Sequence, residues 1–152
     1  MSLIIATGSN IGDSVTHLKN AQKKLQENFT LIKASRIYRS AAVDYLDQPD
    51  FFNQVLEFEI PAMSPSDVLE KLLHIEKEFG RVRDISRGPR TLDLDIIFWN
   101  LEEISLKHLI IPHPRWMERS FIIRPLTELP FFQRVEKCFT IPESFPVEAY
   151  PI

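Results

Sequence analysis

The sequence predicts an α+β fold with an antiparallel sheet and two helices on one face of it. Two segments carry apolar residues at the three- and four-residue spacing of a buried helix face. Four other segments are short and rich in apolar, β-branched or aromatic residues, as strands are. Along the chain these segments follow one another as strand, helix, strand, strand, helix, strand.

The first half of this pattern contains a strand, a turn and a helix. Residues 3–7 form an apolar run that ends at a glycine-punctuated turn, residues 8–13, which we interpret as mainly structural. Residues 13–27 then predict a helix, because Val15, Leu18, Ala21 and Leu25 share one face.

Two further strands are predicted over residues 30–38 and 52–60. The stretch from Ser40 to Asp50 between them is too long for a tight hairpin turn. Long loops inside compact domains are often functional, so this loop is a candidate part of a site.

The second helix has strong boundary signals. Ser64-Pro65-Ser66-Asp67 supplies a capping residue, a proline at the first helical position and an acid in the first turn. Gly80 can adopt the left-handed conformation that closes the helix. In the strand that follows, one face carries Leu92, Leu94, Ile96 and Phe98, and the opposite face carries Asp93, Asp95 and Ile97. This order of elements matches a ferredoxin-like βαββαβ unit, in which both helices cover one sheet face.

The remainder predicts additions to this unit. We expect a short strand near Ile104 and a short helix within residues 118–129 that is interrupted at Pro125. Residues 131–152 contain three prolines and are predicted to form an irregular tail that packs through its aromatic residues or is partly mobile. At 152 residues, the chain is predicted to be one domain, residues 1–152.

Composition narrows the classes of function. The chain has 18 basic and 21 acidic residues, a balance that does not favour a nonspecific nucleic-acid binder. Cys138 is the only cysteine, so no internal disulfide forms and a reducing cytoplasm is the expected compartment. The start has no basic leader, and no apolar run approaches the ~18 residues needed to span a bilayer, so we expect no membrane insertion.

Asp93 and Asp95 are candidate metal ligands. At i and i+2 on one strand face their Cα atoms lie ~7 Å apart, from a rise of ~3.4 Å per residue. Two carboxylates at this spacing can bridge hard cations such as Mg²⁺. Acids on the solvated face of an edge strand give the same string, so the spacing alone leaves the metal site open.

Other candidate residues surround this pair. Arg81, Arg83, Arg87 and Arg90 precede it, and guanidinium groups match phosphate oxygens, although a solvated charged loop gives the same run. His113 lies between two prolines and can hydrogen-bond a phosphate or be structural. Asn53, near Phe51 in the sequence, can hydrogen-bond a heterocycle beside a stacking ring, or the two residues can belong to the core. Phe121 leaves the same two alternatives open.

Taken together, several motifs resemble the 6-hydroxymethyl-7,8-dihydropterin pyrophosphokinase family of folate biosynthesis. The resemblance covers roughly residues 3–130 and follows the family's order. Its most specific part is the string Gly88-Pro89-Arg90-Thr91-Leu92-Asp93-Leu94-Asp95. Further matching segments are residues 8–13, 35–39, 47–53, 80–83, 112–113 and 119–121.

The resemblance implies transfer of the β,γ-diphosphate of ATP to the pterin hydroxymethyl group, with release of AMP. It implies that Asp93 and Asp95 hold two Mg²⁺ ions and that the catalytic residues are Arg81, Arg90 and Asp95. The implied ATP contacts are Glu76, Arg83, Ile96, His108, Leu109, Ile110, His113 and Arg119. The implied pterin contacts are the rings of Phe51 and Phe121, the side chain of Asn53, and the backbone of Ser40, Ala42 and Val43. A monomer is the family expectation.

The chain departs from the family pattern at two places. Ser40-Ala41-Ala42 stands where the family often has Thr-x-Pro. Arg87 directly precedes Gly88, where a tryptophan is common, and the loop is one residue shorter than in a familiar member.

Three other functions fit parts of the pattern. A ferredoxin-like RNA-binding module would need paired exposed aromatics in its central strands, which residues 52–57 lack. A nucleotide-sugar transferase with a DxD motif would need more room for two substrates than this chain offers. A pterin- or nucleotide-binding protein without turnover is disfavoured by Asp93, Asp95, Arg81 and Arg90.

Overall fold

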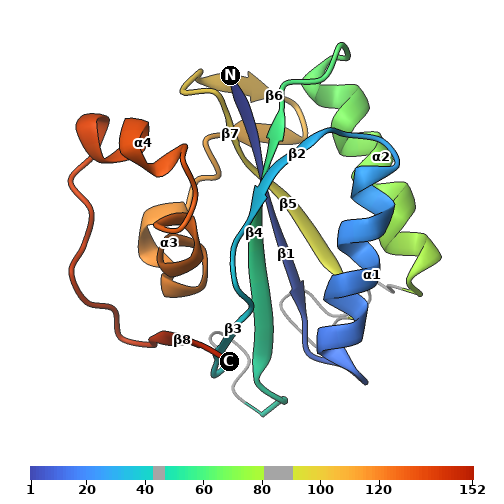
Figure 1. Ribbon diagram of the computed structural model, residues 1–152, viewed down its shortest axis with the longest axis vertical. Coiled ribbons are helices and arrows are strands. Elements are labelled where there is room, and N and C mark those ends of the chain that lie inside the picture. The colour runs from blue at the N-terminus through green and yellow to red at the C-terminus, as the bar shows by residue number, and fades with distance from the viewer. Residues whose placement is uncertain (43–46, 81–90) are drawn as a thin grey trace.

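The computed structural model describes residues 1–42, 47–80 and 91–152 (Figure 1). The first part of the chain forms β1 (Ser2–Ser9), α1 (Ser14–Gln26), β2 (Leu31–Ala34), β3 (Tyr38–Ser40), β4 (Phe51–Glu59) and α2 (Pro65–Glu78). The second part forms β5 (Asp93–Trp99), β6 (Ile104–Leu106), β7 (Leu109–Ile111), the 3₁₀ helix η1 (Trp116–Glu118), α3 (Ser120–Leu126), α4 (Phe132–Cys138) and β8 (Ala149–Pro151).

The main sheet has the strand order β5-β1-β4-β3-β8, and β2 also pairs with β4. Every pairing in this sheet is antiparallel. Helices α1 and α2 lie together on one face of the sheet, while α3 and α4 lie on the other (Figure 1). The predicted α+β, ferredoxin-like fold with C-terminal additions is confirmed.

Both helices begin with a side-chain cap, and the cap of α2 at Ser64 is the predicted one. The carboxylate of Asp13 accepts a hydrogen bond from the amide of Thr16 at 3.2 Å, and α1 begins at Ser14, the residue after Asp13. Ser64 Oγ accepts from the amide of Asp67 at 3.1 Å, and Pro65 occupies the first turn of α2. Both caps satisfy amides that have no partner within the helix.

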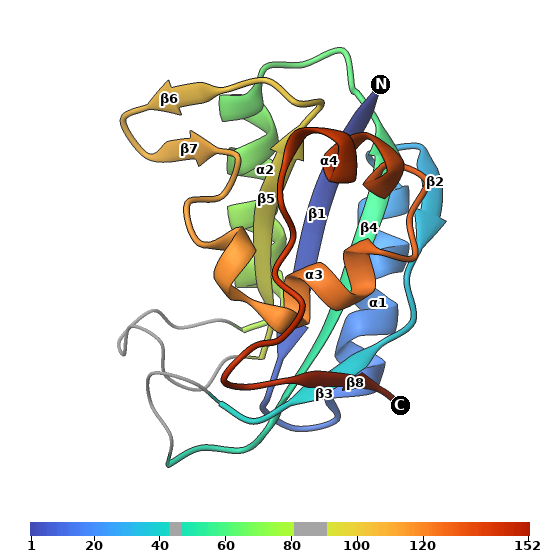
Figure 2. The same cartoon turned by 90° about the vertical axis from the view of Figure 1, so that its left-hand side faces the viewer.

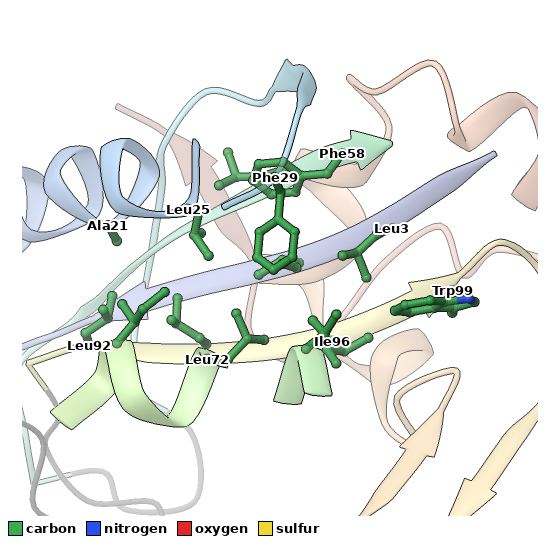
Figure 3. Close-up of a cluster of buried hydrophobic side chains, with 14 of the residues drawn as sticks. Leu3, Ala21, Leu25, Phe29, Phe58, Leu72, Leu92, Ile96 and Trp99 are labelled. Carbon is green, nitrogen blue, oxygen red and sulfur yellow. The ribbon is translucent and has the colours of Figure 1, made fainter. Parts of the chain in front are cut away.

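One hydrophobic core lies between the sheet and helices α1 and α2 (Figure 3). It includes Leu18, Ala21 and Leu25 from α1 and Leu72 from α2, all of them fully buried. The strands contribute residues such as Leu3, Phe58 and Leu94, and Leu92 joins them from just before β5. This core fixes the positions of β1, β4 and β5 from one face of the sheet.

A second core lies under α3 and α4 (Figure 2). Its members include Trp116, Ile123, Phe131 and Val135, and the rings of Phe98 and Phe131 lie 5.3 Å apart. The prediction of an irregular tail over residues 131–152 was therefore wrong, because this segment contains both α4 and β8. Its aromatics do pack, as predicted.

Three local predictions also need correction. A bulge in β5 beside Ile4 and Ile5 shifts the alternation, so Phe98 joins Ile97 in the second core instead of following Ile96. The strand predicted over residues 30–38 is two strands, β2 and β3. Pro125 lies within α3, which continues to Leu126, so it does not interrupt the helix.

The break between β2 and β3 has a local cause. Ser35 Oγ accepts a hydrogen bond from the amide of Val55 at 3.0 Å, and the amide of Ser35 donates to the carbonyl of the same residue. A side chain thus replaces one backbone partner at this point.

Among the described residues, no helix is both long and apolar enough to cross a bilayer.

Candidate active site

A pocket opens on the α3 face of the sheet, above the ends of β1, β4 and β5. The residues that line it come from β1, β3, β4, β5, α3 and the loop before β4. They are Ala6, Thr7, Gly8, Ser40, Ala41, Gln48, Phe51, Asn53, Asp93, Asp95, Arg119, Phe121 and Ile122. The fold thus brings the predicted metal ligands together with five of the predicted substrate contacts, Ser40, Phe51, Asn53, Arg119 and Phe121.

Asn53 is held tightly against β1. It pairs with Gly8 across the two strands, and a Cβ atom on Gly8 would lie 2.6 Å from Asn53 Nδ2. Asn53 Nδ2 donates to the carbonyl of Thr7 at 3.4 Å. A glycine in a strand often marks such a close approach, so Gly8 is a site residue that this signal would have found. We had interpreted its turn as mainly structural.

Two buried polar atoms in this pocket have no hydrogen-bond partner among the described residues. They are Asn53 Oδ1 and Ser40 Oγ, and their residues are 8% and 4% exposed. Buried polar groups in native proteins are nearly always paired. The two atoms therefore indicate that a polar ligand completes this wall of the pocket.

The loop before β4 is anchored by Asn10. The side-chain amide of Asn10 donates to Gln48 Oε1 at 2.8 Å and to the carbonyl of Pro49 at 3.1 Å. This contact orients Gln48 and Phe51 at the pocket. Arg119 and Phe121 lie at the start of α3. The guanidinium of Arg119 is 5.6 Å from the centre of the Phe121 ring, close enough for a cation–π contact.

Asp93 and Asp95 are half-buried and share one face of β5. Their partners on β1 are Gly8 and Ala6, whose small side chains leave room beside both carboxylates. Between them, the amide of Leu94 donates to Glu76 Oε2 at 2.7 Å. Because β5 is an edge strand, this contact satisfies an amide that no neighbouring strand pairs.

Glu76 belongs to α2, is only 1% exposed, and reaches the backbone of β5 with its side chain. It lines neither this pocket nor a second pocket at the outer edge of β5. Its predicted contact with ATP stays a prediction, and its visible contact is with the strand that carries the two aspartates.

A second pocket lies along the outer edge of β5. Its walls are α2, β5, the β6–β7 hairpin and the segment after β7. The lining residues are Leu69, Leu94, Asp95, Ile96, Lys107, His108, Leu109, Ile110, His113 and Pro114. Five of the predicted ATP contacts meet here, namely Ile96, His108, Leu109, Ile110 and His113. Asp95 lines both pockets, so the two sites adjoin at this carboxylate.

His113 is held as a neutral imidazole. Burial, with help from the positive charges of Arg119 and Arg115, lowers its pKa to about 4, although Asp93 opposes the shift. Its Nδ1 accepts a hydrogen bond from the amide of Arg115 at 3.1 Å, which places the ring hydrogen on Nε2. His113 can therefore donate one hydrogen bond from Nε2 at neutral pH.

Five of the candidate residues lie outside the described residues: Arg81, Arg83, Arg87, Arg90 and Val43. Ala42, the last described residue before residues 43–46, is buried and follows the lining residue Ala41 in the chain. Lining residues that sequence reasoning missed include Gln48, Ile122, Leu69 and Lys107. Their positions depend on tertiary packing, and only Gln48 belongs to a motif that the sequence had singled out.

The chemistry of the aspartate pair fits Mg²⁺. Within the described parts of the chain, no cluster of three or more His, Cys, Asp or Glu side chains could enclose a metal ion. Mg²⁺ does not require one, since it is commonly bound by one or two carboxylates together with water and substrate phosphates. Two half-buried carboxylates at the junction of two pockets match this mode of binding.

A family model described as 7,8-dihydro-6-hydroxymethylpterin-pyrophosphokinase matches residues 4–130. The chain belongs to this family. This confirms the resemblance seen in the sequence and favours it over the RNA-binding and nucleotide-sugar alternatives. The family match ends just before α4, so residues 131–152 lie beyond it.

Relatives in this pyrophosphokinase family support the assignment. A Bacillus subtilis protein named 2-amino-4-hydroxy-6-hydroxymethyldihydropteridine pyrophosphokinase is 44% identical over 142 residues, which cover 92% of this chain and 83% of that protein. An Aquifex aeolicus protein of the same name is 35% identical over 84% of this chain and 79% of its own. The folic acid synthesis protein fol1 of Pneumocystis carinii is 39% identical, but the match spans only 17% of that protein.

Proposed function

We propose that this chain transfers the β,γ-diphosphate of ATP to 6-hydroxymethyl-7,8-dihydropterin in folate biosynthesis, giving AMP and the pterin diphosphate. The observation that carries the proposal is the position of Asp95 in the walls of two adjoining pockets. A transferase must bring a donor and an acceptor together, and this junction is where their reacting groups would meet. Membership in the family supports the same conclusion.

The pocket on the sheet face suits a pterin. Asn53 Oδ1 is a buried acceptor that the N–H groups of the heterocycle would satisfy, and Ser40 Oγ can donate or accept beside it. Phe51 and Phe121 line the same pocket and offer flat apolar surfaces to a ring. The backbone of Ser40, Ala42 and Val43 is proposed to complete the hydrogen bonding.

The pocket at the edge of β5 suits ATP. Ile96, Leu109 and Ile110 supply apolar surface for the base, with His108 beside them. Neutral His113 would donate from Nε2 to a phosphate oxygen. We propose phosphate contacts for Arg119, Arg83, Arg81 and Arg90, the last two as catalytic residues, and a further ATP contact for Glu76.

We propose that Asp93 and Asp95 hold two Mg²⁺ ions together with the triphosphate. When bound there, such ions would neutralise the charge on the transferring phosphates. Glu76 maintains the strand between the two aspartates, because its carboxylate holds the amide of Leu94.

The reaction requires little covalent help from the protein. The hydroxymethyl oxygen forms a bond to the β-phosphorus while the bond from that phosphorus to the α-phosphate oxygen breaks, and AMP leaves. The proton of the hydroxymethyl group passes to water as the new bond forms. Residues of this chain would hold the two substrates in line and stabilise the charge that develops, which is how phosphoryl transfer is usually catalysed.

An assay with ATP, Mg²⁺ and the hydroxymethyl-dihydropterin tests this proposal. Phosphorus NMR is expected to show AMP and a pterin diphosphate as products. ADP with a pterin monophosphate would contradict the pyrophosphokinase assignment. No turnover in the presence of tight binding of both substrates would favour the noncatalytic alternative.

Asp95→Ala tests the role of the junction. We expect AMP formation to fall by at least about a thousandfold, as it does when a central charge-stabilising group is lost. Asp67→Asn, an exposed change at the start of α2, is the matched control and should keep full activity. Undiminished turnover in Asp95→Ala would remove this residue from the catalytic site, and an unchanged circular dichroism spectrum would show that its fold is intact.

We also propose that the protein acts as a monomeric single domain in the cytoplasm. The single cysteine, an exposed free thiol at Cys138, supports a reducing compartment. Light scattering tests the oligomeric state, since a monomer has a mass of 17.7 kDa. A mass twice as large would contradict this part of the proposal.

A further inference from the structure

The C-terminal segment contacts two elements that line the pterin pocket, β3 and α3. After α4 the chain runs across α3 and ends in β8, beside β3 (Figure 2). Residues 131–152 lie beyond the part of the chain that the family model matches. The contacts of this segment therefore concern a feature that the family match does not cover.

On one side this segment extends the sheet. β8 pairs with β3 in an antiparallel register that places Ala149 beside Ser40, and the amide of Ile152 donates to the carbonyl of Ile37 at 3.0 Å. On its other side, β3 pairs with β4, where Ser40 lies beside Phe51. Ser40 thus lies between a pocket residue of β4 and the C-terminal segment.

Besides pairing with β3, the C-terminal segment also contacts α3. Ser120, the first residue of α3, is 1% exposed, and its hydroxyl donates to the carbonyl of Val147 at 2.6 Å. Its chain neighbours, Arg119 and Phe121, both line the pterin pocket. This hydrogen bond therefore fixes the point from which the two pocket side chains project.

One turn later, Arg124 makes a denser set of contacts. Its guanidinium donates to both carboxylate oxygens of Glu148, at 3.1 and 2.9 Å, and to the carbonyl of Glu143 at 2.8 Å. It also lies 5.0 Å from the centre of the Phe145 ring, whose backbone amide donates to Glu148 at 3.3 Å. Two-pronged contacts of this kind fix orientation as well as distance.

Apolar packing does not replace these contacts at the start of α3. A hollow lies between this part of the helix and the C-terminal segment, lined by Arg119 and Phe121 on one side and by Pro142, Phe145 and Val147 on the other. Phe121 thus has open space on the side away from the pterin pocket. Its position depends on how α3 is held.

We infer that residues 143–151 form a strap that sets the distance between α3 and β3 and so the width of the pterin pocket. Arg124 and Glu148 are positioning residues in this strap, since they line neither substrate pocket described above. The inference rests on the proposed function, because it assigns the pocket to the pterin. It adds a determinant of pterin affinity that lies beyond residues 4–130, the part of the chain that the family model matches.

If residues 143–151 act as this strap, its loss should weaken binding of the pterin much more than binding of the nucleotide. In Glu148→Ala and Arg124→Ala, the dissociation constant of the fluorescent probe 6-hydroxymethylpterin should rise roughly tenfold, because small misplacements of binding groups cost this much or more. The dissociation constant of Mg²⁺ with α,β-methylene-ATP should rise by no more than about threefold. Of the proposed ATP contacts on described residues, Arg119 adjoins the strap, whereas Ile96, His108, Leu109, Ile110 and His113 lie in the pocket at the edge of β5. The double variant should bind the pterin probe as tightly as either single variant, because both substitutions remove the same contact between Arg124 and Glu148.

Glu143→Ala is the matched control. It removes the same charge from the same segment, but Glu143 contacts Arg124 only through its backbone carbonyl. Its affinity for the pterin probe should stay at the wild-type value. Equal pterin affinity in Glu148→Ala and Glu143→Ala would overturn the strap, as would an equal loss of affinity for both substrates, which a general structural defect produces.

Hydrogen exchange on the ligand-free protein separates this inference from the proposed function. In Glu148→Ala, amides of residues 38–40 and 120–126 should exchange faster than in the wild type, while those of residues 93–99 should not change. Unchanged exchange at all three sites would overturn the strap whether or not the pterin binds. A wild-type protein that shows no affinity for the pterin probe would instead overturn the proposed function.

Discussion

Gly8 and Asn53 illustrate how single residues set the geometry of the site. The two residues are paired across β1 and β4, and Asn53 Nδ2 occupies the space where a Cβ atom on Gly8 would lie. Gly8→Ala should therefore displace the Asn53 amide. We expect roughly tenfold weaker pterin binding, because losing a hydrogen bond to a buried group costs on the order of 1.4 kcal/mol. Fluorescence titration with 6-hydroxymethylpterin measures this change.

Gly12→Ala is a suitable control for that variant. Gly12 has a φ angle of +69°, so an alanine there costs roughly 1 kcal/mol of folding free energy without touching Asn53. Its pterin affinity should equal that of the wild type. If both alanine variants bind the pterin equally well, Asn53 does not depend on the missing Cβ atom of Gly8.

The protonation of His113 gives a second prediction for a single residue. Its imidazole C2 proton should titrate with a pKa near 4 in the ligand-free protein, because burial and then the charges of Arg119 and Arg115 disfavour the imidazolium. The resonance is assigned as the one missing from His113→Gln. A titration midpoint at the ordinary value of about 6.5 would show that His113 is not held neutral.

This shift also makes stability depend on pH. Because the pKa of His113 is lower in the folded state than in the unfolded state, its contribution is fully present above pH ~6.5 and is lost as the pH falls towards 4. Because His113 is partly open to solvent, which screens its interactions, the wild type should lose on the order of 1 kcal/mol more unfolding free energy than His113→Gln between pH 7 and pH 5. Urea unfolding at the two pH values measures the difference.

Much of the site could be predicted residue by residue, and the reasons for the exceptions are physical. Asp93 and Asp95 belong to a string that is specific to one family, and the strand period alone places them on one face. Gln48 and Lys107 reach the pockets through the packing of loops and a hairpin, which local patterns do not encode. Gly8 was visible but was interpreted too narrowly, as a turn residue.

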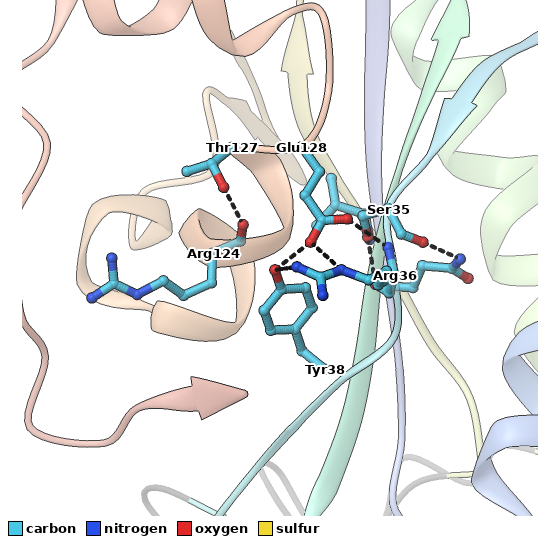
Figure 4. A network of polar contacts seen from close by, with 8 residues as sticks. Ser35, Arg36, Tyr38, Arg124, Thr127 and Glu128 are labelled. Carbon is cyan, nitrogen blue, oxygen red and sulfur yellow. Dashed lines mark hydrogen bonds and ion pairs between the residues drawn. The ribbon is translucent and has the colours of Figure 1, made fainter. Parts of the chain in front are cut away.

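At the scale of secondary-structure elements, α3 is joined to β3 by Glu128 as well as by the strap (Figure 4). Glu128 accepts hydrogen bonds from the amide of Arg36 at 2.9 Å, from the Arg36 guanidinium at 3.1 Å, and from the hydroxyl of Tyr38. Burial, and then this contact with Glu128, raise the pKa of Tyr38 to about 12. The network connects the end of α3 to the strand that carries Ser40.

Removal of this link should destabilise the fold. Glu128→Ala leaves the buried Tyr38 hydroxyl without its acceptor, which should lower the free energy of unfolding by about 1–3 kcal/mol. Glu136→Ala, an exposed change on α4, should stay within about 0.5 kcal/mol of the wild type. Urea denaturation compares the two, and equal stabilities would show that the network contributes nothing.

Elements with long periodic patterns were predictable, and short ones that depend on distant partners were not. The apolar stripes and caps of α1 and α2 fix both helices locally. β8 has only three residues and forms because β3 offers it a free edge. For α4, the spacing of Phe131, Val135 and Phe139 was a usable signal, but the surrounding prolines outweighed it. The β5 bulge that moves Phe98 depends on the register with β1, which one strand alone does not reveal.

At the scale of the whole molecule, one sheet separates two cores and belongs to both. β1 contributes Leu3 and Ile5 to the core under α1 and α2, and Ile4 and Ala6 to the core under α3 and α4. Neither core can lose its packing without exposing one face of the same strands. We therefore expect the two cores to unfold together, as a single cooperative domain does.

The two tryptophans allow this expectation to be tested. Trp99 lies in the first core and Trp116 in the second, and they are 7% and 5% exposed. Trp116→Phe and Trp99→Phe each leave one reporter, whose fluorescence transition in urea should coincide with the far-ultraviolet circular dichroism transition of the same variant. Leu72→Ala, in the first core, should cost roughly 2–5 kcal/mol and shift the transition seen by Trp116 in the second. If the midpoint of the Trp116 fluorescence transition is unchanged by Leu72→Ala, the C-terminal helices unfold separately from the ferredoxin-like unit.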